Sequence, residues 1–361
     1  MAGLVPNARS RSIAESATLA IAAQAALLKA AGHDVVSLGA GEPDFPTPEP
    51  IARAGIAAIE QGNYRYTAAA GVAELRAAGA RWLETFGLDY TADEVMVCAG
   101  AKAALHMALA AIVEPGDRVL VLAPYWVSYP ALVAVSNGEP VIVAPDPARG
   151  FVHDAASIEA AARRHAPKGL IVNWPNNPSG AVPTRDDVAA LVDVARRLDF
   201  WIVSDEIYAT LTYDGAEHVS PAAVPGGRER TVVVNGFTKS HTLTGWRTSF
   251  LAGPRDVVAA ATRIQSQVLG NACTISQAAM LQACRDPLPD EVARRRRSFD
   301  ERRRFLVDAV RALPGARITP PKGAFYALID LREVCEKRGL DDLAVCRQLL
   351  DRHHLALVPG S

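Results

Sequence analysis

The stretch N-G-F-T-K-S-H-T-L-T-G-W-R, residues 235–247, follows the apolar run Val232–Val234. It places Lys239 and Arg247 among four side chains that carry hydroxyl groups. In a parallel sheet that is buried on both faces, strands are short apolar runs, and ligands bind in the loops beyond their carboxyl ends. The stretch therefore predicts a buried strand followed by a loop that presents two cations to a ligand.

The surrounding sequence repeats this pattern of short apolar runs. From about residue 90 to residue 255, β-rich runs alternate with helical ones, such as the helix expected at Ala101–Val113. This alternation predicts an α/β fold with a mainly parallel sheet covered by helices. The seven expected strands are Glu94–Val97, Arg118–Leu122, Pro140–Ala144, Gly169–Asn173, Phe200–Ser204, Thr231–Val234 and Ser249–Ala252.

The two ends of the chain have a different character. The Ala-rich stretch 14–31 is interrupted by charged and polar residues before it reaches a membrane-spanning length, so we expect a helix packed on the protein. Beyond residue 289 the pattern predicts a smaller α+β domain. Its expected elements are the helix Val292–Leu313, the strands Ala316–Ile318 and Ala324–Ile329, the helix Leu343–His353 and the strand Leu355–Val358.

These patterns predict three regions of the chain. Residues 1–45 form an N-terminal arm and part of the small domain, residues 46–288 form the large domain, and residues 289–361 form the rest of the small domain. The boundary near 289 follows from the change from alternating strands and helices to a basic helix.

Composition narrows the class of protein. Half of the 361 residues are apolar, which allows a large core, and the formal charge is -1, with 38 basic and 39 acidic residues. This balance argues against a nucleic-acid binder, and the acidic residues within the basic run Ala293–Phe305 indicate a solvated helix face. The five cysteines are widely spaced, without a C-x-x-C pair, which indicates neither a metal site nor a disulfide framework. We therefore expect a small-molecule protein of the reducing cytoplasm, without a metal.

Polar motifs follow other predicted strands as well. W-P-N-N-P-S-G at 174–180 and D-E-I-Y at 205–208 each come directly after a strand, as the lysine stretch does. Further motifs lie in order along the chain: A-G-E-P-D-F at 40–45, Y-T-A-A-A-G at 66–71, G-A-K at 100–102, P-Y-W at 124–126, K-G-A-F-Y at 322–326 and V-P-G at 358–360. Together they resemble the class I aminotransferases, fold-type-I enzymes that use pyridoxal 5'-phosphate. The chain is most similar to the bacterial aspartate aminotransferase subgroup.

The resemblance implies a role for each matching residue. Lys239 corresponds to the lysine that forms an imine with the cofactor aldehyde, and it also acts as general base. Arg247, the Thr238 hydroxyl and the backbone amides of Ala101 and Lys102 correspond to the phosphate site, where a helix N-terminus favours an anion. Asp205 corresponds to the carboxylate that keeps the pyridine nitrogen protonated, so that the ring accepts electrons. Thr238 has the alternative of capping backbone.

Other matches lie around the ring and the substrate. Asn177 and Tyr208 resemble residues that hydrogen-bond the ring oxygen, and Trp126 resembles the aromatic residue stacked on the ring. Tyr66 resembles a tyrosine that reaches the partner subunit's phosphate. The simpler alternatives are a turn for Asn177, packing for Tyr208 and Trp126, and interface contact for Tyr66. The substrate-binding residues implied by the family are Gly41, Lys102, Trp126 and Asn177.

The function implied is that of a homodimeric amino acid aminotransferase that passes an amino group to a 2-oxo acid. Aspartate and glutamate are the candidate donors, because the G-A-K lysine, Lys102, matches one that reaches their distal carboxylate. The alternative is a lysine that only neutralises the phosphate or lies in solvent. A pyridoxal-phosphate lyase or decarboxylase on the same fold is another interpretation, because the same electron sink stabilises several carbanions.

Two departures from the family pattern stand out. His241 occupies a position where many members carry a small or an aromatic residue. The sequence ends at Ser361, before the expected strand whose arginine binds the substrate α-carboxylate. From this ending we expect either an incomplete sequence or a product that binds the cofactor but is catalytically impaired.

Overall fold

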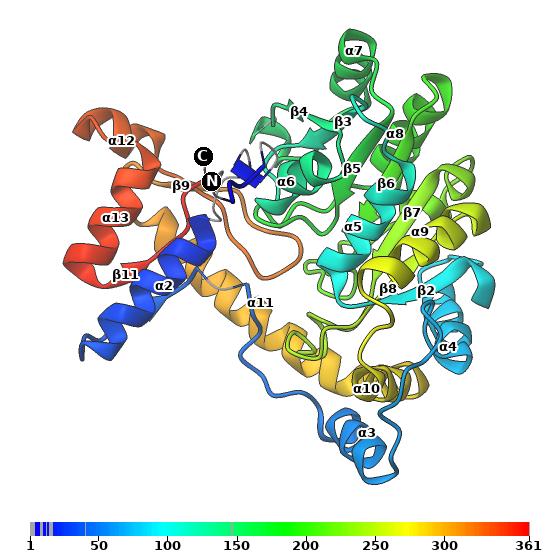
Figure 1. Ribbon diagram of the computed structural model, residues 1–361. Helices are drawn as coiled ribbons and strands as arrows, with labels where there is room; N and C mark the ends of the chain where they lie inside the picture. The colour runs from blue at the N-terminus through cyan, green and yellow to red at the C-terminus, as the bar shows by residue number, and fades with distance from the viewer. Residues whose placement is uncertain are drawn as a thin grey trace.

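The main sheet has seven strands and forms the centre of the molecule (Figure 1). A computed structural model of the chain describes residues 4–7, 10–11, 13, 17–39, 41–145 and 147–360. The strand order is β2-β8-β7-β6-β5-β3-β4, and β8 alone runs antiparallel to its neighbours within this sheet. The strands are β2 Val95–Cys98, β3 Arg118–Leu122, β4 Glu139–Val143, β5 Gly169–Asn173, β6 Trp201–Asp205, β7 Thr231–Asn235 and β8 Ser249–Ala252. All seven predicted strands are confirmed, with ends shifted by at most one residue.

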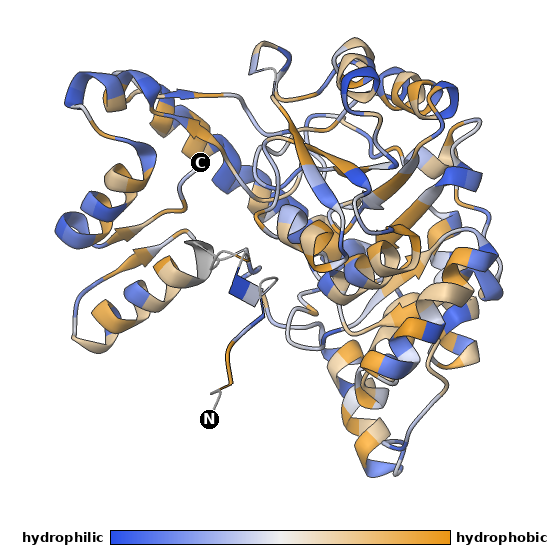
Figure 2. Cartoon of the chain, turned by 45° about the horizontal axis from the view of Figure 1, so that its top comes forward, coloured by the Kyte–Doolittle hydropathy of each residue, from blue (hydrophilic) through white to orange (hydrophobic). Residues whose placement is uncertain are grey.

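Apolar residues on both faces of the strands explain why they read as continuous apolar runs. In β7, Val232 and Val234 pack in one core cluster and Val233 packs in another. Successive side chains of a strand point to opposite faces, so each face must be covered by helices. In Figure 2 the strands of this sheet are mostly orange, with blue at a few polar residues, whereas the helices around it carry both blue and orange residues. The covering helices are α4 Ala73–Glu84, α5 Ala101–Ile112, α6 Ser128–Val135, α7 Ala155–His165, α8 Arg185–Arg197, α9 Arg255–Val268 and α10 Thr274–Arg285. The helix α3 Glu49–Glu60 packs on α10 instead of on the sheet.

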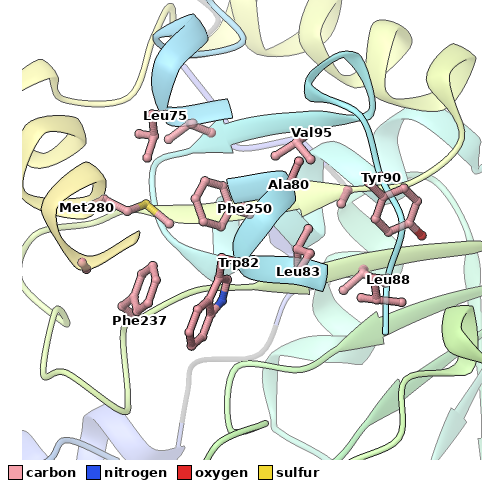
Figure 3. Packing of buried hydrophobic residues seen from close by; sticks show 14 of the residues in the cluster. Leu75, Ala80, Trp82, Leu83, Leu88, Tyr90, Val95, Phe237, Phe250 and Met280 are labelled. Carbon is pink, nitrogen blue, oxygen red and sulfur yellow. The ribbon is translucent and has the colours of Figure 1, made fainter. Parts of the chain in front are cut away.

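A cluster of large side chains supports the loop that carries Lys239. Trp82, Phe237 and Met280 belong to this cluster, and they come from α4, the lysine loop and α10 (Figure 3). The Trp82 indole nitrogen Nε1 donates a hydrogen bond of 3.0 Å to Oδ1 of Asn235, the last residue of β7. The start of the lysine loop is therefore held by buried packing and by one buried polar contact.

The ends of the chain meet in a second, smaller unit. β1 (Val36–Ser37) pairs in parallel with β11 (Leu355–Ala356), and α2 (Ala17–Ala30) packs on this pair through Ile21, Ala25 and Leu28. The expected N-terminal helix is thus confirmed over the residues that the structure describes. The remaining elements of this unit are α11 Pro289–Arg311, β9 Arg317–Ile318, β10 Ile329–Asp330, α12 Arg332–Arg338 and α13 Asp342–His353. Within the described ranges every helix is too short or too polar to cross a membrane.

Three predictions about the C-terminal part were wrong in detail. The strand expected at Ala324–Ile329 forms only at Ile329–Asp330, because Ala324 has a φ of +56° and bonds to the 211–213 segment instead of a neighbouring strand. The final strand is also shorter than Leu355–Val358. Within the basic run on α11, Arg295 is only 2 % exposed and does not belong to a solvated face. Ala40, the first residue of the A-G-E-P-D-F motif, lies outside the described residues, and so does Ser361.

Candidate active site

The carboxyl ends of five strands bring the predicted residues into one region. Asp205 ends β6, Lys239 lies in the loop after β7 and Asn177 follows β5. Ala101 begins α5 after β2, and Trp126 lies after β3. Because these strands are parallel to one another, their carboxyl ends lie on the same edge of the sheet. The predicted site is therefore assembled by the sheet topology.

Lys239 is largely buried, and its amine has a defined position. The ammonium nitrogen Nζ donates a hydrogen bond of 2.6 Å to the Gly41 carbonyl, and it lies 5.9 Å from the ring centroid of Tyr208. Burial lowers the pKa of Lys239, and the nearby Arg247 lowers it further, while Asp205 and Glu42 oppose the shift. A lowered pKa makes the neutral, nucleophilic amine more accessible at neutral pH.

Asp205 is a buried carboxylate held at three points. The Tyr129 hydroxyl donates a 2.8 Å hydrogen bond to Oδ2, and the Ile207 amide donates to Oδ1 at 3.3 Å. Asn173 donates from Nδ2 to the Asp205 backbone carbonyl at 2.9 Å. Burial raises the pKa of Asp205 to about 6, although Tyr129, Ile207 and Lys239 all favour the charged form. The group suits pairing with a protonated ring nitrogen, which would favour the ionised carboxylate.

Tyr208 and Tyr326 form a buried pair of hydroxyl groups, 2.7 Å apart. Burial raises the pKa of both residues, so both stay protonated at neutral pH. A Cβ atom on Gly41 would collide with the Tyr326 hydroxyl, so the glycine makes room for this side chain. The sequence motifs predict no role for Tyr326, although it ends the K-G-A-F-Y motif. Its contact with Tyr208 joins segments that are far apart in the chain.

The N-terminus of α5 and Arg247 form an anion-binding corner. Gly100, the residue before α5, has a φ of +90° and provides no side-chain cap for the helix. A Cβ atom on Gly100 would lie 2.7 Å from Arg247 Nη2, so only glycine allows this close approach. Among the described residues no carboxylate lies within ion-pair distance of Arg247. The corner therefore presents the first-turn amides of Ala101 and Lys102 and a guanidinium whose Nη1 donates to the Thr244 carbonyl at 3.0 Å.

The Thr238 hydroxyl is already used in this structure. It is 6 % exposed and donates a 3.3 Å hydrogen bond to the Thr248 carbonyl. This is the backbone-capping alternative that the sequence left open. A phosphate contact would require the hydroxyl hydrogen to turn away from Thr248, because a hydroxyl has one hydrogen to donate.

Lys102 and Trp126 meet at the mouth of the site. The Lys102 ammonium lies 4.8 Å from the centre of the Trp126 ring. Partial burial lowers the pKa of Lys102, and repulsion from Arg247 lowers it further. No acidic side chain within the described part of the chain pairs with this ammonium. It is available to an anionic group of a ligand.

Asn177 and Tyr66 are placed differently from each other. The Asn177 amide N–H donates to Asn173 Oδ1 at 2.7 Å, which anchors the backbone. Its side chain has no hydrogen bond to any described residue and remains available to a ligand. Tyr66 is 98 % exposed on the surface of this chain, in contrast to the buried residues of the site such as Asp205 and Tyr208.

The donor set fits a phosphorylated pyridine aldehyde. The anion-binding corner suits a phosphate, the buried Asp205 suits a ring nitrogen, and the Lys239 amine between them suits an aldehyde. The Gly100 position supports this fit, because the missing Cβ leaves the guanidinium directly against the helix N-terminus. Tyr129, Asn173 and Tyr326 are further residues of the site that the sequence reading did not identify.

Comparison with known proteins agrees with this geometry. Residues 33–361 match the family model of aminotransferase class I and II. An aspartate aminotransferase from Streptomyces avermitilis is 41% identical over 98% of this chain and 88% of its own length. A bifunctional aspartate aminotransferase and glutamate/aspartate-prephenate aminotransferase from Petunia hybrida is also 41% identical, over 98% of this chain and 75% of its own. The solved aspartate aminotransferase from Thermus thermophilus with maleate superposes with a TM-score of 0.93 at 39% identity, covering 100% of this chain and 92% of that one.

Proposed function

This chain belongs to the class I and II aminotransferases and is a pyridoxal-phosphate-dependent amino acid aminotransferase, and from that premise we propose that acidic amino acids are its donors. The observation that carries the proposal is the Lys102 ammonium beside Trp126, which has no acidic partner among the described residues. A second carboxylate on the substrate would supply that partner. The Thermus relative, whose structure holds the dicarboxylate maleate, supports the same substrate class.

The geometry supports a proposed role for each of the site residues. When bound, pyridoxal phosphate supplies an electrophilic carbon and a ring that accepts electrons. Lys239 would hold it covalently, and Asp205 would accept a hydrogen bond from its ring nitrogen. The amides of Ala101 and Lys102, together with Arg247, would bind its phosphate, and Thr238 would join them if its hydroxyl turned. Asn177 and Tyr208 would donate to its ring oxygen, and Trp126 would cover one face.

Proton transfer at the substrate is assigned to Lys239. Its lowered pKa leaves a larger share of neutral amine at neutral pH, and a neutral amine can take a proton from the substrate Cα. The Gly41 carbonyl holds the amine in one position at 2.6 Å. The Gly41 backbone therefore serves the reaction by orientation, close to where the substrate would bind.

The oligomer and the compartment are also proposals. Tyr66 is exposed, and other exposed apolar residues of the large domain include Ile56, Ile59 and Tyr64, which supports a homodimer in which Tyr66 reaches the partner subunit's phosphate. The division into 1–45, 46–288 and 289–361 is supported by the pairing of β1 with β11. All five cysteines are free, which supports a reducing cytoplasm.

A donor survey tests the substrate class and the reaction class together. The cofactor-loaded protein is mixed with aspartate, glutamate, alanine or phenylalanine, and the visible absorbance and the released 2-oxo acid are measured. Conversion of the cofactor to its amine form with one equivalent of oxo acid is expected for the acidic donors. Release of carbon dioxide without oxo acid would instead identify a decarboxylase. A preference for neutral donors would overturn the acidic-substrate proposal.

Lys102→Ala sharpens the survey. We expect kcat/KM for aspartate to decrease, and the decrease should correspond to a loss of about 1–3 kcal/mol of transition-state stabilisation. The value of kcat/KM for phenylalanine should change little. The control is Lys168→Ala, which removes an exposed lysine next to the opposite end of β5. An equal loss for both donors would mean that Lys102 serves the cofactor alone.

A further inference from the structure

Arg295 is buried within a run of exposed arginines. Its neighbours Arg294, Arg296 and Arg297 are exposed on α11, whereas Arg295 is 2 % exposed. Removing a guanidinium from water is costly unless each of its donors finds a partner. The contacts that Arg295 makes therefore indicate what this side chain does.

The guanidinium joins three segments of the chain. Nε donates to Glu291 at 2.8 Å on the same helix, and Nη1 donates to the Thr242 hydroxyl at 2.8 Å. Nη2 donates to the Pro46 carbonyl at 2.6 Å. The Phe45 ring lies 5.3 Å from the guanidinium carbon. Arg295 thus connects α11 to the lysine loop and to the segment that follows Gly41.

Thr242 has a backbone conformation that needs support. Its φ is +54°, in the left-handed region that a β-branched residue rarely adopts. The Arg295 contact holds its side chain, and the Thr47 hydroxyl donates to its carbonyl at 2.8 Å. Such strain persists only where neighbouring groups fix the conformation.

Both segments held by Arg295 define the position of the catalytic amine. Thr242 lies three residues after Lys239, and Pro46 lies five residues after Gly41, whose carbonyl accepts the hydrogen bond from Lys239 Nζ. We propose that Arg295 is a positioning residue that keeps Thr242 in its left-handed conformation and so fixes the Lys239 amine against Gly41. This inference rests on the proposed role of Lys239.

The first test replaces Arg295 and measures the amine instead of turnover alone. Arg295→Met and Arg295→Lys are compared with Arg297→Met, an exposed position on the same helix. The cofactor-free proteins are mixed with pyridoxal phosphate, and the adduct fixed by borohydride is followed by mass spectrometry. The pH midpoint of the bound cofactor's visible absorbance and the unfolding temperature of the cofactor-free protein are measured in parallel.

We expect Arg295→Met to capture the cofactor about 10- to 100-fold more slowly, because misplacing a reactive group by about 1 Å costs that much. The pH midpoint should move as well, and Arg297→Met should match the parent protein. Arg295→Lys keeps the charge but lacks the planar fork that reaches Glu291, Thr242 and Pro46 together, so its rate of capture should fall between those of Arg295→Met and Arg297→Met. Normal capture and an unchanged midpoint in the Arg295 variants, with or without a lower unfolding temperature, would overturn the inference.

The second test acts on the other side of the contact. In the Arg295→Met background, Thr242→Gly should recover capture several-fold, because glycine adopts a positive φ without strain. Thr242→Ala removes the same hydroxyl but keeps the strain, so it should not recover. Equal behaviour of the glycine and alanine variants would overturn the role of the backbone conformation. A borohydride-stable adduct in Lys239→Ala would overturn the proposed role of Lys239 itself, which separates the two failures.

Discussion

The two ends of the site are built in opposite ways. Around Asp205, the polar side chains are buried and already bonded to one another, as the contacts from Tyr129 and between Tyr208 and Tyr326 show. Around Arg247, the donors are backbone amides and an exposed guanidinium that lack an acidic partner among the described residues. The buried end can act on developing charge without rearrangement, whereas the open end gains its partner only when an anion arrives.

The largest expected effect comes from the buried end. Asp205→Ala should slow Cα deprotonation by an amount equal to about 3 kcal/mol or more, because a preorganised charge acts strongly in a dry site. Single-turnover loss of the substrate Cα proton measures this rate, and added salt should hardly change the effect, because the carboxylate is buried. Near-normal deprotonation in the variant would show that the buried end is only structural.

The second effect extends the comparison to the lysine loop. His241 donates from Nε2 to the Pro287 carbonyl, and its Nδ1 lies within hydrogen-bond distance of the Ser240 hydroxyl, both at 2.8 Å, so both ring nitrogens have partners. Burial, helped by repulsion from Arg295, lowers the pKa of His241 to about 4, although the Pro287 contact, Glu291 and Asp286 oppose the shift. The unusual His241 therefore stabilises the lysine loop by connecting it to the Pro287 carbonyl.

The sign of the pH dependence follows from this shift. Between pH 6.5 and 4, His241 binds a proton in the unfolded chain but stays neutral in the folded chain. The free energy of unfolding therefore decreases as the pH falls through that window. His241→Gln keeps an amide donor but does not titrate, and it should remove up to about 3 kcal/mol of the acid-induced loss. Urea unfolding at pH 7.5 and pH 4.5 measures it. Parallel pH profiles of the parent and the variant would contradict a buried neutral ring.

The smallest effect belongs to the open end. Arg247→Ala should weaken binding of pyridoxamine phosphate, which has no aldehyde, by about 2 kcal/mol, the scale of a hydrogen bond to a charged group. Because Arg247 is exposed, raising the salt concentration should reduce the difference. Equilibrium dialysis at two salt concentrations measures it, with the exposed Arg163→Ala on α7 as the control. A difference that salt leaves unchanged would mean that the corner is not open to solvent.

The contrast also explains what the sequence could predict. Six of the seven strands were predictable because each is an apolar run that is largely buried on both faces, and the edge strand β4, which is partly exposed, still carries an apolar run. The motifs that follow the strands lie at the edge of the sheet. The roles of Tyr129 and Tyr326 were not predictable, because their hydrogen bonds to Asp205 and Tyr208 depend on packing between distant segments. The burial of Arg295 was predictable from its spacing, because it lies four residues before the buried Phe299, on the same helix face. The surrounding run of arginines favoured a solvated face instead.

The pairing of β1 with β11 has a consequence for the order in which the protein forms during synthesis. β1 leads into the segment that carries Gly41, and its partner strand β11 comes long after it in the sequence. On the ribosome, the lysine loop and the main sheet can be complete while β1 still waits for residues 355–356 to emerge. Pairing between such distant strands is slow because a very long loop must close. The segment that carries the Gly41 carbonyl, which accepts the hydrogen bond from Lys239 Nζ, is therefore anchored through β1 only after residues 355–356 have been made.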